Sequence, residues 1–223
     1  MSRVCVFDVN ETLLDLTALD PYFVELFGDG ASRQDWFGQV LRSAMLATAT
    51  GQYRDFGEVG GAALGIVAQR RGVTLPDGAG AGLGARMREL PAHPEVPAAL
   101  ARLADAGLRM ATLTNSPLAT AQAQLDNAGL AGHFEAILSA EHAGLLKPAA
   151  APYHMAAERL GVPTSGIRLI AAHDWDVTGA IRAGATAAFV ARPGMVLDPT
   201  GETPDIVGSD LDDVADRILA VDR

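Results

Sequence analysis

The chain has 223 residues, and its 27 acidic against 17 basic side chains give it a formal charge of −10. This excess of negative charge disfavours nucleic acid and anionic membranes as partners. Hydrophobic residues make up 49% of the chain and charged residues only 20%, which predicts a folded domain with a sizeable core and excludes a disordered tail. No apolar run reaches the ~18 residues of a membrane-spanning helix, so we expect a soluble, cytoplasmic protein.

Apolar, β-rich segments recur along the chain. They span residues 4–7, 108–113, 136–138, 168–172 and 186–190. From the second onward they alternate with helical stretches, which predicts an α/β fold with a parallel sheet. The single cysteine, Cys5, lies in the first segment, which favours a buried core thiol and excludes an intrachain disulfide or a cysteine-rich zinc site.

The stretch between residues 14 and 90 has a different pattern. It lacks β-rich runs, and four segments in it have helical spacing of their apolar residues. These segments are residues 21–27, 34–49, 55–71 and 81–90. A proline-marked segment at 91–94 follows, where a helix cannot continue comfortably. We therefore expect a helical cap, residues 14–90, inserted into a discontinuous core of residues 1–13 and 91–223.

A glycine-rich patch at residues 78–84 has the composition of a phosphate-binding loop. No predicted strand precedes it, however, and no Lys-Ser or Lys-Thr pair follows it. We interpret this patch as a flexible turn between cap helices.

Polar residues follow four of the predicted strands. In a parallel α/β sheet, ligands bind at the carboxyl ends of the strands, so these residues form the candidate site. They are Asp8, Asn10 and Thr12 in the first loop, Thr114 and Asn115 in the second, Lys147 in the third, and His173, Asp174 and Asp176 in the fourth. Lys147 is the only lysine of the chain, which weakens the case for an ordinary surface role.

The order of these motifs resembles the haloacid dehalogenase superfamily. The features that carry the resemblance are an Asp-x-x-x-Thr-Leu loop from Asp8, a Leu-Thr-Asn loop at Thr114 and Asn115, the Lys147-Pro148 pair and an acidic fourth loop. The resemblance covers almost the whole chain and implies a Rossmann-like parallel-sheet core with a helical cap after the first strand. It also implies that Asp8 is a nucleophile that Lys147 keeps ionised.

The residue types alone also permit structural roles. Asp8 and Thr12 can each cap a helix, and Lys147 can be a solvated loop charge. Thr114 and Asn115 can satisfy the turn that follows them. A hydroxyl group and free N–H groups at a helix start also bind anions, so both roles are compatible.

Two positions distinguish the chain from the phosphatases of this superfamily. Phosphatases have a second aspartate two residues after the nucleophile, but this chain has Asn10, whose amide cannot donate and recover a proton. They also tend to have an acid where this chain has Ala172. The Mg²⁺ ligands of a phosphatase alternative would be Asp8, Asn10, Asp174 and Asp176. Because this set is poor in carboxylates, we expect no metal and no other cofactor.

The closer resemblance is to the 2-haloacid dehalogenases, which need no metal. Tyr153, six residues after Lys147, and the Trp175-Asp176 pair fit this branch. The resemblance implies that Asp8 displaces halide from the carbon next to a carboxylate, and that water activated near Asp176 opens the resulting ester to a 2-hydroxy acid. The implied substrate-binding residues are Asn10, Thr12, Thr114, Asn115 and Tyr153. The implied partner is a small anionic organic acid. The sequence leaves open whether the chain forms a homodimer.

The fourth loop departs from the dehalogenase pattern. The family has a Ser-x-Asn where this chain has Ala171 to His173, and an aromatic residue at the position of Asn10. A histidine can relay a proton near neutral pH, so His173 is a candidate catalytic residue that Asp174 or Asp176 would orient. A structural histidine explains the sequence equally well.

The cap departs further from the dehalogenase pattern than the fourth loop does. The family's halide-binding arginine follows a tryptophan, whereas in this chain Phe37 follows Trp36. Arg33, Arg42 and Arg54 lie in the right region to replace that arginine, although cap arginines are mostly solvated. Side chains that can form a pocket wall, or simply pack the cap, are Trp36, Phe37, Met45, Tyr53 and Phe56.

These features favour a metal-independent hydrolytic dehalogenase of small 2-haloacids. A Mg²⁺-dependent phosphatase and a non-catalytic binding protein of the same superfamily are the alternatives. The fold alone does not distinguish among these three functions, so the arrangement of the site has to decide between them.

Overall fold

The protein is built on a parallel sheet of six strands in the order β3-β2-β1-β4-β5-β6. The computed structural model describes residues 3–222. The strands are β1 (Val4–Phe7), β2 (Met110–Thr114), β3 (Ala136–Ser139), β4 (Ile167–Ala171), β5 (Thr186–Val190) and β6 (Ile206–Gly208). The predicted α/β parallel sheet is confirmed. The sequence did not predict β6, which has only three residues and exposes Val207.

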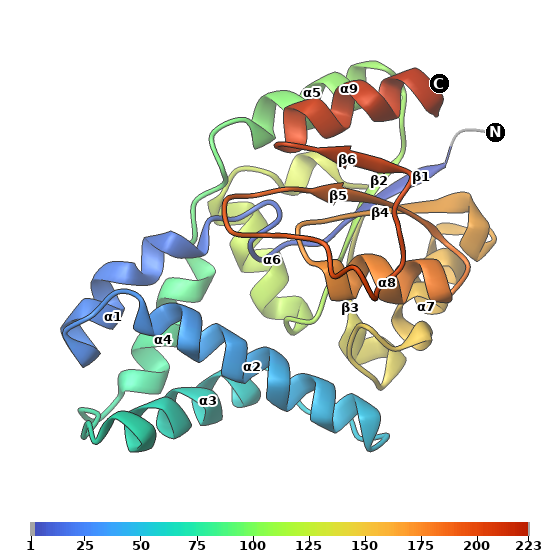
Figure 1. Cartoon of the computed structure of the whole chain (residues 1–223). Coiled ribbons are helices and arrows are strands. Elements are labelled where there is room, and N and C mark those ends of the chain that lie inside the picture. The colour runs from blue at the N-terminus through green and yellow to red at the C-terminus, as the bar shows by residue number, and fades with distance from the viewer. Residues whose placement is uncertain (1–2, 223) are drawn as a thin grey trace.

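Helices cover both faces of the sheet (Figure 1). They are α5 (Val96–Asp105), α6 (Leu118–Asn127), α7 (Ala150–Leu160), α8 (Asp174–Arg182) and α9 (Leu211–Val221). Alternate residues of a strand point to opposite faces. Cys5 and Phe7 of β1 therefore join the core under α5 and α9, whereas Val4 and Val6 join the core under α7 and α8. Burial raises the pKa of the Cys5 thiol to about 12, which agrees with an inert core thiol.

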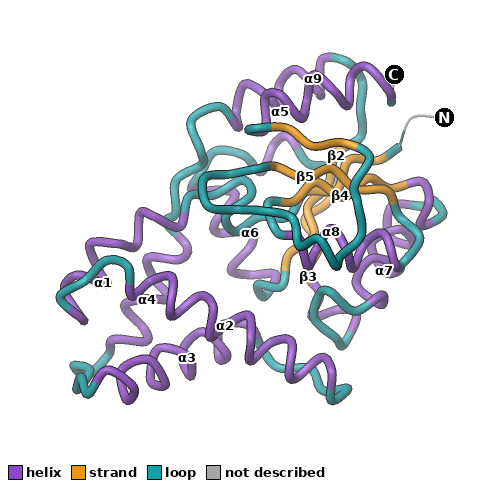
Figure 2. Tube along the Cα trace, in the orientation of Figure 1, coloured by secondary structure: helices purple, strands orange, loops and turns teal. Residues whose placement is uncertain are grey.

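A helical layer inserted between β1 and α5 forms the cap, as the resemblance implies (Figure 2). It contains a short 3₁₀ helix (Leu16–Leu19) and helices α1 (Asp20–Phe27), α2 (Ser32–Ala49), α3 (Phe56–Arg71) and α4 (Ala79–Arg88). The two connections to the core lie side by side, because Asp15 N donates to Pro91 O at 2.8 Å and His93 N donates to Leu13 O at 3.0 Å. The domain limits at 13/14 and 90/91 stay a prediction.

The glycine-rich patch is part of a helix, so its interpretation as a flexible turn is wrong. Only Gly78 adopts a left-handed turn conformation, and α4 begins at the next residue. A Cβ atom at Gly82 would lie 2.7 Å from the Tyr22 hydroxyl, which donates to Ala79 O. Glycine therefore allows α1 to approach α4 closely, and this packing outweighs the low helix propensity of glycine.

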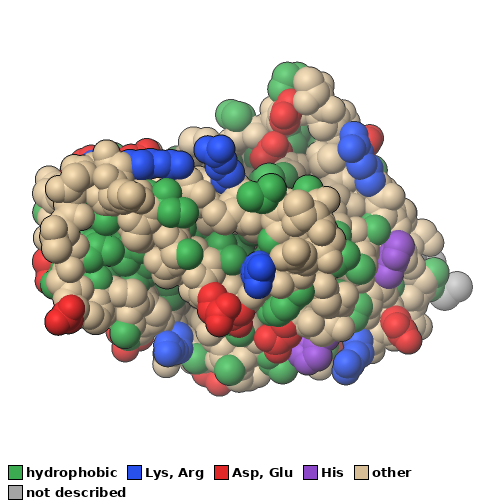
Figure 3. Space-filling view, turned by 90° about the horizontal axis from the view of Figure 1, so that it is seen from below, with side chains coloured by type: hydrophobic (Ala, Val, Ile, Leu, Met, Phe, Trp, Pro, Cys, Tyr) green, Lys and Arg blue, Asp and Glu red, His purple; other side chains and the backbone are tan. Residues whose placement is uncertain are grey.

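Two further observations concern the surface. Within residues 3–222, no helix is both long and apolar enough to cross a membrane. On the face shown in Figure 3, basic and acidic side chains are interspersed and form no continuous basic patch.

Candidate active site

Lys147 joins two carboxylates at the carboxyl ends of the central strands. Its Nζ atom lies 2.9 Å from Oδ1 of Asp8 and 2.6 Å from Oδ2 of Asp176, and it also donates to Leu113 O at 2.8 Å. All three charged side chains are buried. The structure therefore brings together Asp8, Lys147 and Asp176, as the sequence predicts.

The charges of this cluster stabilise one another. Burial alone would raise the pKa of Asp8, but Lys147, His173 and hydrogen bonds from Lys147 and Thr12 outweigh it and lower that pKa. Burial would lower the pKa of Lys147, but Asp176 and Asp8 raise it. Burial, together with the charge of Asp8, raises the pKa of Asp176 despite its contact with Lys147. Asp8 is thus the carboxylate that the cluster keeps ionised.

Hydrogen bonds fix the orientation of both carboxylates. Thr12 Oγ1 donates to Oδ2 of Asp8 at 2.7 Å and accepts from Ala172 N at 2.9 Å. Tyr153 is buried, and its hydroxyl donates to Oδ1 of Asp176 at 2.6 Å. Thr12 therefore ties the first loop to the fourth, while Tyr153 supports Asp176 from behind.

The second loop holds the backbone of Lys147. Asn115 accepts from Lys147 N at 2.8 Å and donates to Lys147 O at 3.2 Å. Thr114 Oγ1 accepts from Ser116 N at 3.1 Å. Thr114 and Asn115 thus do shape the turn, and both also line the cavity at Asp8.

Asn10 connects the first loop to the cap through Gln124. Its Nδ2 atom donates to Ser116 Oγ at 3.1 Å, and its Oδ1 atom accepts from Gln124 Nε2 at 3.0 Å. Gln124 Nε2 also donates to Met87 O of α4 at 2.8 Å. Sequence reasoning missed Gln124, since a glutamine 114 residues away along the chain from Asn10 gives no local signal.

His173 faces different carboxylates from those that the sequence indicated. Its Nε2 atom lies 3.6 Å from Oε2 of Glu11 and 3.9 Å from Oδ2 of Asp8. Asp176 is turned toward Lys147 and Tyr153, and Asp174 makes no such approach to the imidazole within the described chain. The expectation that Asp174 or Asp176 orients His173 is therefore wrong.

A cavity of about 10 Å³ lies directly at Asp8. Its walls come from both core and cap. The lining residues are Asp8, Asn10, Phe37, Leu41, Phe56, Thr114, Asn115, Lys147, His173 and Trp175. A space of this size holds about one water molecule. Asp176 and Tyr153 do not line it, so Asp176 acts on this space through Lys147, which does.

The cap places Phe37 at this cavity and its arginines elsewhere. Phe37 on α2 is buried against Trp36 and approaches His173, with ring centroids 5.8 and 6.0 Å apart respectively. Arg33 is also buried, but its guanidinium lies 2.5 Å from Asp20 and 3.5 Å from Glu11. Arg42 and Arg54 are exposed and line neither this cavity nor the one outside it. The structure thus brings Phe37, but neither Arg42 nor Arg54, to the site.

Two larger cavities adjoin the cavity at Asp8. The outer cavity, of about 590 Å³, shares His173, Phe37 and Trp175 with it and is also lined by Glu11 and Arg33. A cavity of about 260 Å³ lies between cap and core and shares Phe37 and Phe56 with it. The outer cavity and the cavity at Asp8 thus meet at His173, Phe37 and Trp175.

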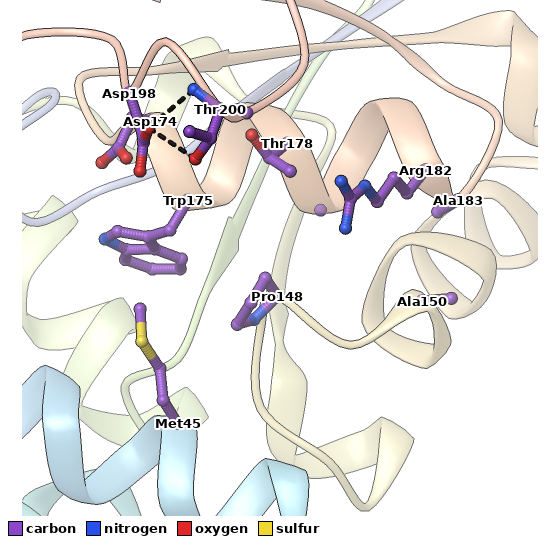
Figure 4. A pocket seen from close by; sticks show the side chains of 12 residues that line it. Met45, Pro148, Ala150, Asp174, Trp175, Thr178, Arg182, Ala183, Asp198 and Thr200 are labelled. Carbon is purple, nitrogen blue, oxygen red and sulfur yellow. Dashed lines mark hydrogen bonds between the residues drawn. The ribbon is translucent and has the colours of Figure 1, made fainter.

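Trp175 separates the site from a third cavity, of about 490 Å³, shown in Figure 4. There its indole lies near Met45 of α2, and the indole nitrogen is on the side away from Pro148. This Nε1 atom is buried and meets no acceptor within residues 3–222. A buried N–H donor without an acceptor costs ~1–3 kcal/mol, so this indole N–H would gain from an acceptor placed beside it.

The residues of the phosphatase alternative do not fit a Mg²⁺ site. In the described part of the chain, no group of three or more His, Cys, Asp or Glu side chains is arranged to hold a metal ion. Lys147 Nζ lies between the carboxylates of Asp8 and Asp176, and both polar atoms of the Asn10 side chain are already hydrogen-bonded. Mg²⁺ needs several oxygen ligands in near-octahedral order, which this arrangement does not offer.

Comparison with known proteins agrees with the fold and with the order of the motifs. A family model described as haloacid dehalogenase-like hydrolase matches residues 2–184. The chain belongs to this family. It is 29% identical over 217 residues to haloacetate dehalogenase H-2 of Moraxella sp. (strain B), and 27% identical to (S)-2-haloacid dehalogenase H-109 of Pseudomonas putida. Each of these alignments covers 96% of both chains.

The fold matches those of solved members of the haloacid dehalogenase-like family. The L-2-haloacid dehalogenase of Xanthobacter autotrophicus, solved with chloropropionic acid covalently bound, superposes with a TM-score of 0.91 at 26% identity. The match covers 99% of this chain and 100% of that one. The chain therefore has the architecture of an L-2-haloacid dehalogenase, with the helical insertion after β1.

Proposed function

We propose that this chain is a metal-independent dehalogenase of small 2-haloacids that forms a 2-hydroxy acid. The observation that carries the proposal is the buried Asp8 carboxylate, which Lys147 holds ionised at 2.9 Å beside the apolar wall of Phe37, Leu41 and Phe56. An ionised carboxylate in such surroundings attacks an electrophilic carbon. The relatives support the proposal, since two of them are dehalogenases of haloacetate and of (S)-2-haloacids.

In the first step, a carboxylate oxygen of Asp8 bonds to the carbon next to the substrate carboxylate. The carbon–halogen bond breaks on the opposite face, and the halide leaves with its electron pair, so the configuration inverts. No proton is transferred, and the amide of Asn10 is therefore no obstacle. The alkoxide that leaves a phosphate ester, in contrast, needs an acid. Thr114 and Asn115, which line the same cavity, would bind the substrate carboxylate.

The leaving halide needs a donor other than the family's arginine, which Phe37 replaces. Our candidate is the Trp175 indole, because Trp175 lines the cavity at Asp8 and its buried N–H has no acceptor within residues 3–222. A donor that is already desolvated and unpaired gains most from a developing anion. Trp175 is therefore assigned to the leaving group under this proposal.

In the second step, water opens the aspartyl ester. The water oxygen bonds to Cγ of Asp8, and one of its protons passes to His173 Nε2, which lies 3.9 Å from Oδ2 of Asp8. The bond between Cγ and the ester oxygen then breaks, and the alkoxide takes that proton to give the 2-hydroxy acid. Asp8 loses its remaining proton to solvent and is again a carboxylate. The resemblance placed water activation near Asp176, but His173 lines the cavity and Asp176 does not.

Halide release tests the proposal. We expect the protein to release halide from 2-chloropropionate or haloacetate at the same rate with and without EDTA. Hydrolysis of p-nitrophenyl phosphate, measured in parallel with and without Mg²⁺, should be absent. Turnover of phosphate esters alone, dependent on Mg²⁺, would show that the chain is a phosphatase.

A single turnover in ¹⁸O-water tests the covalent route separately. With enzyme in excess over substrate, the ester route places ¹⁸O in the Asp8 carboxylate, where mass spectrometry of the proteolytic peptide finds it. Direct attack of water on the substrate would instead place the label in the hydroxy acid.

A further inference from the structure

Glu11 adopts a backbone conformation that side chains other than glycine rarely adopt. Its φ is 62°, in the left-handed region, which costs an L-residue about 1–2 kcal/mol. Hydrogen bonds hold the residue there, since Glu11 N donates to Leu14 O at 2.9 Å and the His93 ring contacts Glu11 O at 3.3 Å. Such strain at a loop beside a reactive group points to a function for the side chain.

The side chain of Glu11 points into the site. Only 13% of its surface is exposed, and Oε2 lies 3.6 Å from Nε2 of His173. The other carboxylate oxygen, Oε1, lies 3.5 Å from Nη1 of Arg33 on the cap helix α2. Glu11 thus connects the cap to the imidazole, and it does so from the loop that carries Asp8.

His173 is not held by any other polar group in the described chain. Its side chain does not cap α8, although the residue occupies the position before that helix. Among residues 3–222, the charged groups that approach its Nε2 atom are Glu11 and Asp8. The aromatic neighbours Phe37 and Trp175 restrict the ring, with centroids 6.0 and 5.1 Å away. The orientation of Nε2 therefore depends on the two carboxylates.

We propose that Glu11 is a positioning residue for ester hydrolysis, holding His173 Nε2 toward Asp8 and stabilising the imidazolium that forms when the histidine takes a proton from water. This inference rests on the proposed function and goes beyond it. Glu11 and His173 both line the outer cavity, and His173 also lines the cavity at Asp8, so water from outside reaches the pair first. A carboxylate next to an imidazolium stabilises the charge while the proton is in transit. Ester formation transfers no proton and does not need Glu11.

Single-turnover kinetics of Glu11→Gln test this role. We expect ester formation, measured as the burst of halide, to stay within about twofold of wild type. Ester hydrolysis should slow by about 10-fold or more, and the acid limb of its pH–rate profile should move. Glu11→Asp, which keeps the charge on a shorter side chain, should recover part of the rate. Equal slowing of both steps with an unchanged pH profile would overturn the proposal and leave Glu11 a structural role.

Glu25→Gln is the matched control. It makes the same change of carboxylate to amide at an exposed position of α1, and Glu25 lines neither the cavity at Asp8 nor the outer cavity. We expect both steps and the pH profile to stay as in wild type. The same loss of ester hydrolysis in Glu25→Gln and Glu11→Gln would show that the general negative charge, and not Glu11, is responsible.

NMR of the His173 imidazole at one fixed pH separates this proposal from the proposed function. Glu11→Gln should change the chemical shifts of the ring, because it alters the group that lies 3.6 Å from Nε2, whereas Glu25→Gln should leave them as in wild type. A wild-type protein that releases no halide would contradict the proposed function, and the ring shifts alone would then decide whether Glu11 acts on His173. Unchanged ring shifts in Glu11→Gln would overturn the pairing.

Discussion

The ammonium nitrogen of Lys147 lies 2.9 Å from Oδ1 of Asp8, and both side chains are buried. The contact keeps Asp8 ionised, yet Lys147 does not depend on it alone, because Asp176 lies 2.6 Å from the same nitrogen. Removing the charge of Asp8 therefore leaves Lys147 paired. The nucleophile can be tested by substitution without leaving a buried ammonium unpaired.

Asp8→Asn should keep the fold and abolish turnover. The side chains are nearly equal in size, and an amide is a poor nucleophile. We expect less than about a thousandth of the wild-type rate of halide release, with an unfolding temperature close to that of wild type. Circular dichroism gives the unfolding temperature. A higher residual rate in a folded variant would show that Asp8 is not the nucleophile.

Phe37→Arg should increase halide release. Phe37 lines the cavity at Asp8 from the cap, so an arginine there would bring a cation to the leaving halide. One added donor to a developing anion should raise kcat/KM for 2-chloropropionate by about 10-fold or more. Arg42→Ala, on the same helix but exposed, should change nothing. A fall in kcat/KM for Phe37→Arg would mean that the aromatic wall, and not a cation, suits the true substrate.

Trp175→Phe should slow halide release but not destabilise the fold. The indole N–H is buried without an acceptor within residues 3–222, and replacing an unsatisfied donor by an apolar group is neutral or stabilising. If this N–H stabilises the leaving halide, ester formation should slow by about 10-fold or more while ester hydrolysis is unchanged. Stopped-flow halide release and urea unfolding measure the two effects. Slower ester hydrolysis with normal ester formation would assign Trp175 to the orientation of His173.

The sheet and the convergence of its four loops could be predicted because their signals are local. Runs such as Val4–Phe7 and Thr186–Val190 are apolar and β-rich, and polar residues follow several of the runs directly. The strand Ile206–Gly208 gives no such signal, since only three residues form it against the sheet edge. The glycines of α4 misled the prediction because propensity is local, whereas the contact with Tyr22 that requires Gly82 is not.

The sequence, through the resemblance, indicated most of the residues at the site and the pairing of Asp8 with Lys147, but not the partner of His173. Nothing in the sequence shows that His173 faces Glu11, because the two residues meet only when the first and fourth loops pack together. The positive φ of Glu11 is also invisible in the sequence. One signal could have drawn attention to Glu11. It directly follows Asn10, the position at which the phosphatases have an acid.

The last prediction concerns the stability of Glu11→Gln. Burial raises the pKa of Glu11, and the negative charge of Asp8 raises it further, despite the opposing effect of His173 and Arg33. A carboxyl group whose pKa is higher in the folded than in the unfolded state favours folding most below its unfolded pKa, and this contribution is lost as the pH rises through the folded pKa. Ionisation of Glu11 in the folded protein therefore lowers the stability of wild type.

Glutamine resembles the neutral form of Glu11 at every pH. The free energy of unfolding of Glu11→Gln relative to wild type should therefore increase as the pH rises from ~4, the ordinary range of a glutamate, and become constant once Glu11 is ionised in both states. Urea unfolding of both proteins between pH 4 and pH 8 measures this difference. An advantage of the variant that instead grew toward low pH would contradict the raised pKa. A more stable variant with slower ester hydrolysis would show that ionised Glu11 is kept for catalysis at a cost to stability.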